Sequence, residues 1–569
     1  DIYYKGLGNK MKKQSVLYGS FLLMLSVIVS RVAGLILKIP LANMLGGTGM
    51  GYYSSAYAVF MPLYALCAGS LPPAIAQSVS ESAAFCNNSR IAKTKRSALI
   101  FFSAVSLAVS LVPLVFADFI SARIIGNPEA KLSVMAISPC IFFGTVTAIY
   151  RGYYEGLKNM TPTAVSQMAD ALVKLVSGLG LAYAVEIYAN RLYMNAEPVF
   201  GKICLNEYEA SAASLPYVAA AAVLGTALAD LAAMLYLILY SRLHKEERTS
   251  SRDGMFDSGI LKELLRMIMP IALASLVSSL LSTIDLSTII LMIKLSLRRH
   301  PELYAERYAA VISSGVTLKE LPNFLYGSFT GLSMAVFTLA PSLCAVFSKS
   351  AFPKISECYA KRDVCEASRE IRRAVCLSIY ISLPAGLGIA AFSRQILGLL
   401  FSSRYAEIEV SSQPLTILAL STAFLAVSVS CYTMLQAIGR ADLPVKITLV
   451  GAVIKLILNT ALIPLNQSGL SGAAASTVIS YFIMCVWSIA ALYRITGTKP
   501  RLVFSVIIPA VCSVLSVGGA KYAYNYLSQR LSLLISLCIS VIFAVIIYIL
   551  TLVLLDISTK NELSTQIFD

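Results

Sequence analysis

LSLLISLCISVIFAVIIYILTLVLL, residues 531–555, is the stretch that decides the fold, because it is predominantly apolar and carries no charge. A helix needs about 20 mostly apolar residues to cross a bilayer. A membrane barrel would instead show short segments of alternating polarity. Uncharged runs of similar length recur at Ser97–Ala117, Ala210–Ala229, Leu321–Ser348, Ala374–Ser393, Val410–Gly439 and Leu456–Tyr493. The sequence therefore predicts an all-α polytopic membrane protein.

The composition supports this prediction. Of the 569 residues, 57% are hydrophobic and only 13% are charged, about half the charged share of a typical soluble domain. This composition excludes a disordered chain and disfavours a soluble multidomain enzyme. The net charge of +16 would suggest a nucleic-acid partner in a soluble protein. Here the basic residues lie mostly in short connections, so we expect no nucleic-acid partner.

About fourteen membrane spans are predicted, with charged residues interrupting three of them. Their approximate limits are 15–40, 50–80, 97–120, 132–152, 162–187, 213–240, 264–293, 321–350, 371–393, 412–437, 444–465, 469–493, 502–524 and 531–555. An even number of spans places both termini on one side. That side carries 29 of the 46 Lys and Arg residues, against 13 on the other side and four within spans. Cytoplasmic connections are enriched in Lys and Arg, so the sequence predicts a cell-membrane protein with cytoplasmic termini.

Three matches indicate an internal repeat. Nearly equal stretches of chain separate Lys174 from Lys455, Pro162 from Pro444, and Pro73 from Pro353. The matched spans are separated by six, so the halves share one orientation, as in parallel-repeat transporters. The expected domains are a cytoplasmic N-terminal segment (1–14), an N-lobe (15–240), a cytoplasmic linker (241–263), a C-lobe (264–493), two further helices (494–555) and a cytoplasmic tail (556–569). Met11 is a candidate start, with residues 1–10 an upstream extension.

The sequence predicts neither a cofactor nor a metal site. Most of the 12 cysteines lie in apolar runs, where reduced thiols pack as small apolar residues. The two histidines, His244 and His300, fall in connections. No Walker motif is present, so transport would draw on an ion gradient or the membrane potential. No connection exceeds about thirty residues, which leaves no room for a soluble catalytic domain, and we expect a protein that is not an enzyme.

Ionisable residues inside the spans are the candidate site. A charge at the centre of a membrane helix costs at least about 2.5–3.5 kcal/mol, so such residues are functional candidates. The predicted substrate-binding residues are Arg31, Lys38, Arg151, Lys174 and Lys455, which together would favour an anionic group. The predicted ion-coupling or charge-balancing residues are Asp170, Asp230 and Asp285.

Other roles remain open for several of these residues. Lys38, Arg151 and the neighbouring Glu155 could extend to the membrane interface. Asp170 and Lys174 are four residues apart on one helix, close enough to form a structural ion pair. Tyr52, Tyr53, Tyr57 and Tyr64 could grip a sugar or a prenyl chain, although core filling or an interfacial belt is the favoured interpretation.

Several motifs resemble one family in order along nearly the whole chain. They are Ser30-Arg31-Val-Ala-Gly34, Lys38-Ile-Pro40, Gly69-Ser-Leu-Pro-Pro-Ala-Ile75, Arg151-Gly-Tyr-Tyr-Glu-Gly-Leu-Lys-Asn-Met-Thr-Pro162, Leu325-Tyr-Gly327 and Pro353-Lys-Ile-Ser-Glu357. This set resembles the stage V sporulation protein B-like transporters, of the multidrug/oligosaccharidyl-lipid/polysaccharide exporter superfamily. The resemblance implies two six-helix lobes in a V, as in multidrug exporters, plus two C-terminal helices.

The resemblance also implies a substrate class. Lipid II and oligosaccharide branches of the superfamily move polyprenyl-pyrophosphate-linked sugars, and Arg31 falls at the arginine of a helix-1 motif of the lipid II flippases. Two departures separate this chain from those flippases. Tyr53 stands about where they carry a carboxylate, and Leu63–Cys67 lacks their arginines. The match is therefore better to the sporulation-type branch.

The expected function is export of a polyprenyl-pyrophosphate-linked saccharide, a peptidoglycan or polysaccharide precursor, by alternating access. The expected partners are this anionic lipid, membrane lipids and a coupling cation, Na⁺ or H⁺, with a monomer as the plausible state. One alternative is a cation-coupled multidrug exporter of the same fold. An alternative of another class is a membrane-embedded cell-envelope enzyme, which would need a positioned acid, base or nucleophile.

Overall fold

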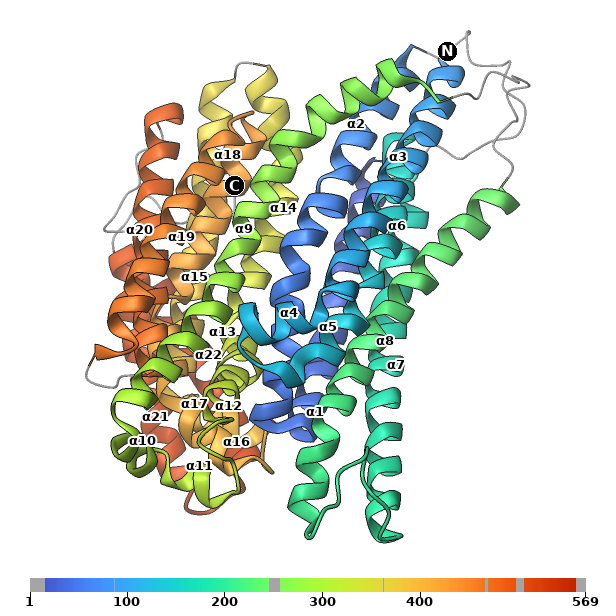
Figure 1. The fold of residues 1–569 in the computed structure, drawn as a ribbon. Coiled ribbons are helices and arrows are strands. Elements are labelled where there is room, and N and C mark those ends of the chain that lie inside the picture. Colours follow the sequence, from blue (N-terminus) through green and yellow to red (C-terminus); the bar gives the residue numbers. More distant parts are fainter. Residues whose placement is uncertain are drawn as a thin grey trace. The chain divides into compact units, whose positions relative to one another are not determined.

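The computed structural model describes residues 16–85, 87–244, 256–361, 363–465, 469–497 and 506–558. These ranges are almost entirely helical, and their one β-type pairing is an isolated bridge between Val199 and Lys202 (Figure 1). The predicted N-terminal segment 1–14 lies outside the described residues. So do residues 245–255 of the predicted linker and 559–569 of the predicted tail.

The apolar helices confirm a polytopic membrane fold. Ten helices are long and apolar enough to span a membrane, or twelve if two bent pairs each count as one span, within the described part of the chain. The first of these ten, Leu22–Ala83, has 62 residues. At 1.5 Å per residue it would measure about 93 Å, about three times the bilayer's hydrocarbon core. It therefore holds more than one crossing, and the total of fourteen stays a prediction.

The chain divides into two compact units. Unit 1 comprises residues 1–37, 56–121 and 129–279, and unit 2 comprises residues 38–55, 122–128 and 280–569. Helix α1 (Val16–Tyr64) is thus shared between the units, as is α9 (Ser258–Arg299). The predicted lobe boundaries contain no such exchange of segments and stay predictions.

The remaining elements belong to one unit or the other. Unit 1 holds η1 (Ala65–Gly69), α2 (Leu71–Ala84), α3 (Asn88–Val115), α4 (Ala117–Phe119), α5 (Lys131–Ile137), α6 (Pro139–Gly156), α7 (Thr161–Met194) and α8 (Glu207–Leu243). Two short elements, η2 (Ile120–Ile125) and η3 (Pro128–Ala130), lie where the chain changes unit. Unit 2 holds α10 (Pro301–Arg307), α11 (Ala309–Ser313), α12 (Leu321–Ser328), η4 (Phe329–Ser333), α13 (Met334–Phe337), α14 (Leu339–Ala360), α15 (Val364–Ala391), α16 (Ser393–Leu400), α17 (Tyr405–Leu420), α18 (Thr422–Ala437), α19 (Asp442–Leu462), α20 (Leu470–Thr496), α21 (Ile508–Leu527) and α22 (Leu533–Ser558).

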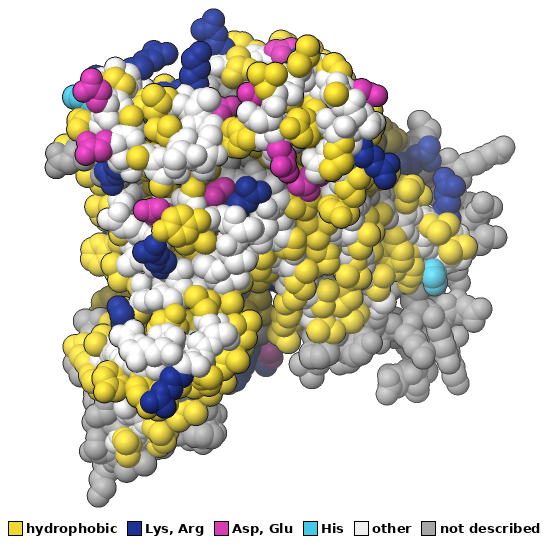
Figure 2. Space-filling model, turned by 90° about the horizontal axis from the view of Figure 1, so that it is seen from below, with side chains coloured by type: hydrophobic (Ala, Val, Ile, Leu, Met, Phe, Trp, Pro, Cys, Tyr) yellow, Lys and Arg dark blue, Asp and Glu magenta, His cyan; other side chains and the backbone are white. Residues whose placement is uncertain are grey.

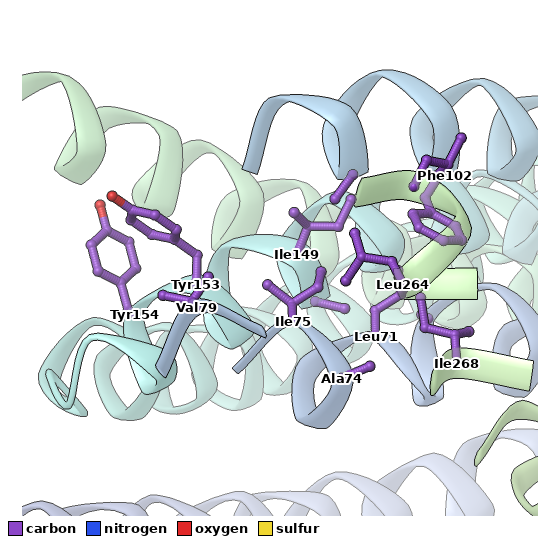
Figure 3. Packing of buried hydrophobic residues seen from close by; sticks show 14 of the residues in the cluster. Leu71, Ala74, Ile75, Val79, Phe102, Ile149, Tyr153, Tyr154, Leu264 and Ile268 are labelled. Atoms are coloured by element: carbon purple, nitrogen blue, oxygen red, sulfur yellow. The ribbon is translucent and has the colours of Figure 1, made fainter. Parts of the chain in front are cut away.

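Unit 1 packs around helices α2 and α6. Leu71 and Ile75 of α2 lie against Ile149 of α6 in a buried apolar cluster that also receives side chains from α3 and α9 (Figure 3). Two glycines of α6 permit this approach. A Cβ at Gly152 would lie 2.7 Å from the Pro72 carbonyl oxygen, and one at Gly156 would lie 2.7 Å from the Val79 Cβ. Small residues at such crossings are typical of membrane helix pairs.

The helix boundaries support the predicted duplication. Helices α3 and α15 each have 28 residues, and each follows a side-chain N-cap, Asn87 or Asp363. The α6–α7 turn contains Lys158 with φ 59°, and the α18–α19 turn contains Gly439 with φ 81°, at the same spacing that separates Lys174 from Lys455. The two N-caps lie slightly closer together along the chain than Pro73 and Pro353 do. The two halves therefore differ by short insertions.

The outer surfaces of many helices are apolar. Large side chains such as Ile542, Ile546 and Leu550 of α22 are about half exposed. Figure 2 shows broad hydrophobic areas, with Lys, Arg, Asp and Glu side chains gathered among polar ones on the same face. Apolar side chains that face outward along spanning helices suit contact with lipid tails.

Candidate polar site in unit 1

Helices α6, α7 and α8 bring four predicted site residues together in unit 1. Asp170 and Lys174 occupy successive turns of α7, Arg151 comes from α6 and Asp230 from α8. Both Arg151 and Lys174 lie close enough to the Asp170 and Asp230 carboxylates to interact with them electrostatically. All four side chains are partly buried. We call these four residues the polar cluster.

A glycine contact between α7 and α8 explains how the cluster forms. A Cβ at Gly225 of α8 would overlap the backbone of Gly178 on α7, so α8 depends on glycine at this crossing. The Ser177 hydroxyl also donates a hydrogen bond to the Gly225 carbonyl oxygen at 3.0 Å. The crossing lies one turn from Lys174 and just over one turn from Asp230, so the two helices carry these side chains to one level.

Arg151 has one hydrogen-bonded nitrogen and one buried nitrogen without a partner among the described residues. Its Nε donates a hydrogen bond to the Ser166 hydroxyl at 2.9 Å. Its Nη2 atom is buried and has no hydrogen-bond partner among the described residues. A buried donor without an acceptor is costly, and more so when it is charged. An exogenous acceptor at Nη2 would remove that cost.

The other members have polar contacts that sequence reasoning did not anticipate. The Lys174 ammonium lies 4.9 Å from the centre of the Tyr57 ring, in cation–π range. The Tyr57 hydroxyl is hydrogen-bonded to Thr226 at 2.6 Å. The Cys140 thiol lies close enough to the Asp230 carboxylate to interact with it. The sequence assigned Cys140 to apolar packing, because a thiol in an apolar run carries no signal of a distant carboxylate.

Arg31 lies at the level of the polar cluster. Ser26 on α1 donates to the Gln167 side chain of α7 at 2.6 Å, and Leu37, eleven residues later, approaches Gly178, eleven residues after Gln167. The two helices therefore run parallel here, and Arg31 corresponds to a level between Asp170 and Lys174. Its side chain is exposed, and no hydrogen bond or ion pair joins it to another described residue.

The structure places the other three predicted residues in unit 2. The Lys455 ammonium donates to Asp285 at 2.7 Å, and the two side chains are only 1% and 6% exposed. Asn459 donates to Asp285 at 3.2 Å and to Thr288 at 2.8 Å, while the Ser476 hydroxyl donates to Asn459. In this structure Asp285 thus balances the charge of Lys455.

Lys38 is also engaged within unit 2. Its ammonium donates to the carbonyl oxygen of Thr330 at 3.3 Å. Thr330 lies in η4, a π-helical turn, and such turns release backbone acceptors and recur at functional sites. No group of three or more His, Cys, Asp or Glu residues in the described ranges could hold a metal ion.

Comparisons with known proteins agree with this architecture. A family model described as polysaccharide biosynthesis protein matches residues 16–204, and the MatE model matches residues 326–461. Stage V sporulation protein B of Bacillus subtilis is 22% identical over 544 residues, covering 92% of this chain and 93% of the relative. Lipid II flippase MurJ of the same organism is 20% identical over 511 residues, covering 86% of this chain and 84% of the relative.

Solved structures share the fold. A lipid II flippase MurJ in an inward closed conformation has a TM-score of 0.65 and 15% identity, covering 93% of this chain and 98% of that one. An inward-facing multidrug resistance MATE family transporter has a TM-score of 0.61 and 15% identity, covering 84% and 100%. The chain is therefore a multi-pass membrane protein, and over most of its length it is similar to transporters of the polysaccharide branch of the multidrug/oligosaccharidyl-lipid/polysaccharide exporter superfamily.

Proposed function

We propose that the protein moves a polyprenyl-pyrophosphate-linked saccharide, a cell-wall or polysaccharide precursor, outward across the membrane by alternating access. The observation that carries this proposal is the unpartnered Nη2 of Arg151, buried within the polar cluster. Arginine binds phosphate oxygens through paired N–H groups. A pyrophosphate oxygen would therefore satisfy a donor that the described protein atoms leave open.

The charges around Arg151 provide cations for an anion. Arg31, Arg151 and Lys174 supply three positive charges, near the carboxylates of Asp170 and Asp230 and, beside Arg151, that of Glu155. Two unit charges 4 Å apart attract by about 4 kcal/mol at the effective dielectric constant near a protein surface. An anionic phosphate oxygen at the unpartnered Nη2 of Arg151 would gain an attraction of this kind.

The relatives support the substrate class. A probable low-salt glycan biosynthesis flippase Agl15 of Haloferax volcanii is 29% identical over 176 residues, 31% of this chain and 36% of the relative. Together with the lipid II flippase it suggests a lipid-linked saccharide as cargo. We propose an ion gradient or the membrane potential as the energy source, Asp170 and Asp230 as charge-balancing or coupling residues, and cytoplasmic termini as the Lys and Arg distribution predicts.

The proposal is tested by reconstitution. Proteoliposomes would contain a polyprenyl-pyrophosphate saccharide with a fluorescent label on the sugar, and transport would be measured as label exposed to a membrane-impermeant quencher. Arg151→Ala should reduce the rate at least about tenfold, equivalent to about 1.4 kcal/mol. Arg151→Lys should retain part of the transport rate, because the lysine ammonium keeps the positive charge but loses the paired N–H groups of the guanidinium.

Arg90→Ala is the matched control. Arg90 lies in the same unit, and its Nε is also buried without a hydrogen-bond partner among the described residues. Its guanidinium, however, forms an exposed ion pair with Glu263 at 2.7 Å, away from the polar cluster, so its loss should leave transport unchanged. Undiminished transport by folded Arg151→Ala would remove Arg151 from the site. Efflux of organic cations without movement of the lipid would instead favour the multidrug exporter, and a covalently altered lipid product would favour the enzyme.

A further inference from the structure

One short segment of helix α1 belongs to a different unit from the chain on either side of it. Residues 38–55 belong to unit 2, whereas residues 16–37 and 56–64 belong to unit 1. The segment contains the turn between the first two predicted spans. Contacts with other residues of unit 2 therefore hold this segment in place.

The turn depends on glycine. Gly46 has φ 59° and ψ −169°, a region of backbone space that is essentially restricted to glycine. Helical conformation resumes at Gly47. A Cβ at Gly46 would also lie 2.9 Å from the Glu407 carboxylate and 3.0 Å from the Arg404 guanidinium. One helix therefore ends and another begins at Gly46, directly against two charged side chains.

Arg404 and Glu407 cap the two helix ends with matching charge. Arg404 donates from Nε and Nη2 to the Asn43 carbonyl oxygen at 2.9 and 2.6 Å, and from Nη2 to Met44 at 2.9 Å. The buried Glu407 carboxylate accepts from the Gly47 amide at 3.0 Å. A cation at a helix C-terminus and an anion at a helix N-terminus are both favoured by the helix dipole.

Further contacts join the 38–55 segment to other parts of unit 2. Asn323 donates to the Thr48 carbonyl oxygen at 2.9 Å, and Asn43 donates to the Leu400 carbonyl oxygen at 3.1 Å. A Cβ at Gly327 of α12 would overlap the Gly47 carbonyl oxygen. The 38–55 segment therefore contacts α12 closely through Gly47 and Gly327, and the charged side chains of Arg404 and Glu407 fix its position there.

We propose that Arg404 and Glu407 form a latch that holds the 38–55 segment on unit 2 in this conformation and releases it during each transport cycle. The proposal rests on the proposed alternating-access function. Both partners fall on the predicted outer side of the membrane, since the turn joins spans one and two and Arg404 lies between spans nine and ten. Arg404 and Glu407 are positioning residues in this scheme, because they act on backbone and not on the cargo.

A reversible cross-link tests whether transport requires the 38–55 segment to move away from its position on unit 2. The Ser403 hydroxyl donates to the Asn43 side chain at 3.2 Å, so an Asn43→Cys, Ser403→Cys variant can be bridged by a short reducible dithiol reagent. Cross-linking should reduce transport of the labelled lipid-pyrophosphate saccharide at least tenfold, and reduction should restore it. The unmodified protein treated with the same reagent corrects for the native cysteines.

The matched control joins the two helices of unit 2 that precede and follow Arg404 in the chain. The Ser393 and Thr416 hydroxyls lie 2.7 Å apart on α16 and α17, so a Ser393→Cys, Thr416→Cys variant should transport equally well with and without the bridge. Full transport by the bridged Asn43–Ser403 variant would overturn the latch. Absence of transport in the unmodified protein would instead count against the proposed function.

Hydrogen exchange tests the latch without any transport assay. Arg404→Ala should speed exchange of the amides of residues 43–51 about tenfold and leave α19 and α20 unchanged. Arg404→Lys, a gentler change, should give a smaller increase in the same segment. Arg394→Ala is the control, because Arg394 is exposed at the same end and contacts Tyr405. Unchanged exchange at residues 43–51, or a uniform increase throughout unit 2, would overturn the proposal.

Discussion

Lys174 and Lys455 occupy matching positions in α7 and α19, one in each half of the repeat, but their surroundings differ. Lys455 is 1% exposed and pairs with Asp285 at 2.7 Å, with Asn459 completing the network. Lys174 is partly buried beside the Tyr57 ring and interacts electrostatically with Asp170 and Asp230. One copy of the repeat thus encloses its lysine in a complete network, whereas the other keeps it in an incompletely satisfied cluster.

The residue one turn beyond each lysine accounts for the difference. Asn459 follows Lys455, and its amide holds both Asp285 and Thr288. The matching position in α7 is Gly178, which has no side chain to donate hydrogen bonds and whose backbone lies against Gly225 of α8. A buried ion pair is expensive to desolvate and needs additional hydrogen bonds to offset that cost. Unit 2 supplies those hydrogen bonds through Asn459, and unit 1 uses the same place for helix packing.

The largest effect should come from breaking the enclosed pair. Asp285→Ala would leave the Lys455 ammonium buried without its partner, and we expect a loss of about 3–5 kcal/mol of stability. Thermal unfolding in detergent would measure it. The double variant Asp285→Leu, Lys455→Met should recover most of the loss. If Asp285→Ala unfolded at the same temperature as the unmodified protein, the Asp285–Lys455 ion pair would not be structural.

A smaller loss should follow from Asn459→Ala. The substitution removes two donated hydrogen bonds and the acceptor of Ser476, and we expect a cost of about 1–3 kcal/mol. Thr460→Ala is a suitable control, since Thr460 is exposed on the same helix and its hydroxyl contacts only the Ile457 carbonyl oxygen. Equal unfolding temperatures for the two variants would contradict the supporting role of Asn459.

The smallest change in stability should come from Lys174→Met, in contrast to Lys455. Lys174 is only partly buried, and the methionine side chain can replace the packing of the lysine methylene groups. We therefore expect less than about 1 kcal/mol of destabilisation. Transport of the lipid-linked saccharide should nevertheless fall about tenfold, because one of three cations is lost. Marked unfolding with unchanged transport would mean that the two lysines play the same structural role.

The sequence anticipated the fold through features that a bilayer imposes locally. Apolar runs such as residues 531–555 predict spanning helices, because an unsatisfied backbone in lipid is too costly for other structures. The spacing of Asp170 and Lys174 correctly placed both on successive turns of one helix. The sequence did not pair Lys455 with Asp285, which lies 170 residues away. Nor did it connect Arg404 with Asn43, because a charge in a short connection resembles any solvated loop residue.

The sequence by itself determined that this is a helical, duplicated membrane protein with ionisable residues inside its spans. These properties follow from composition, periodicity and spacing along one chain. Only the tertiary structure decided that Asp285 neutralises Lys455, that Arg151 keeps an open donor and that Gly46 sits between Arg404 and Glu407. The physical reason is that a charge in a low-dielectric interior depends on the groups within a few ångströms of it. Helix packing alone brings those groups together from distant parts of the chain.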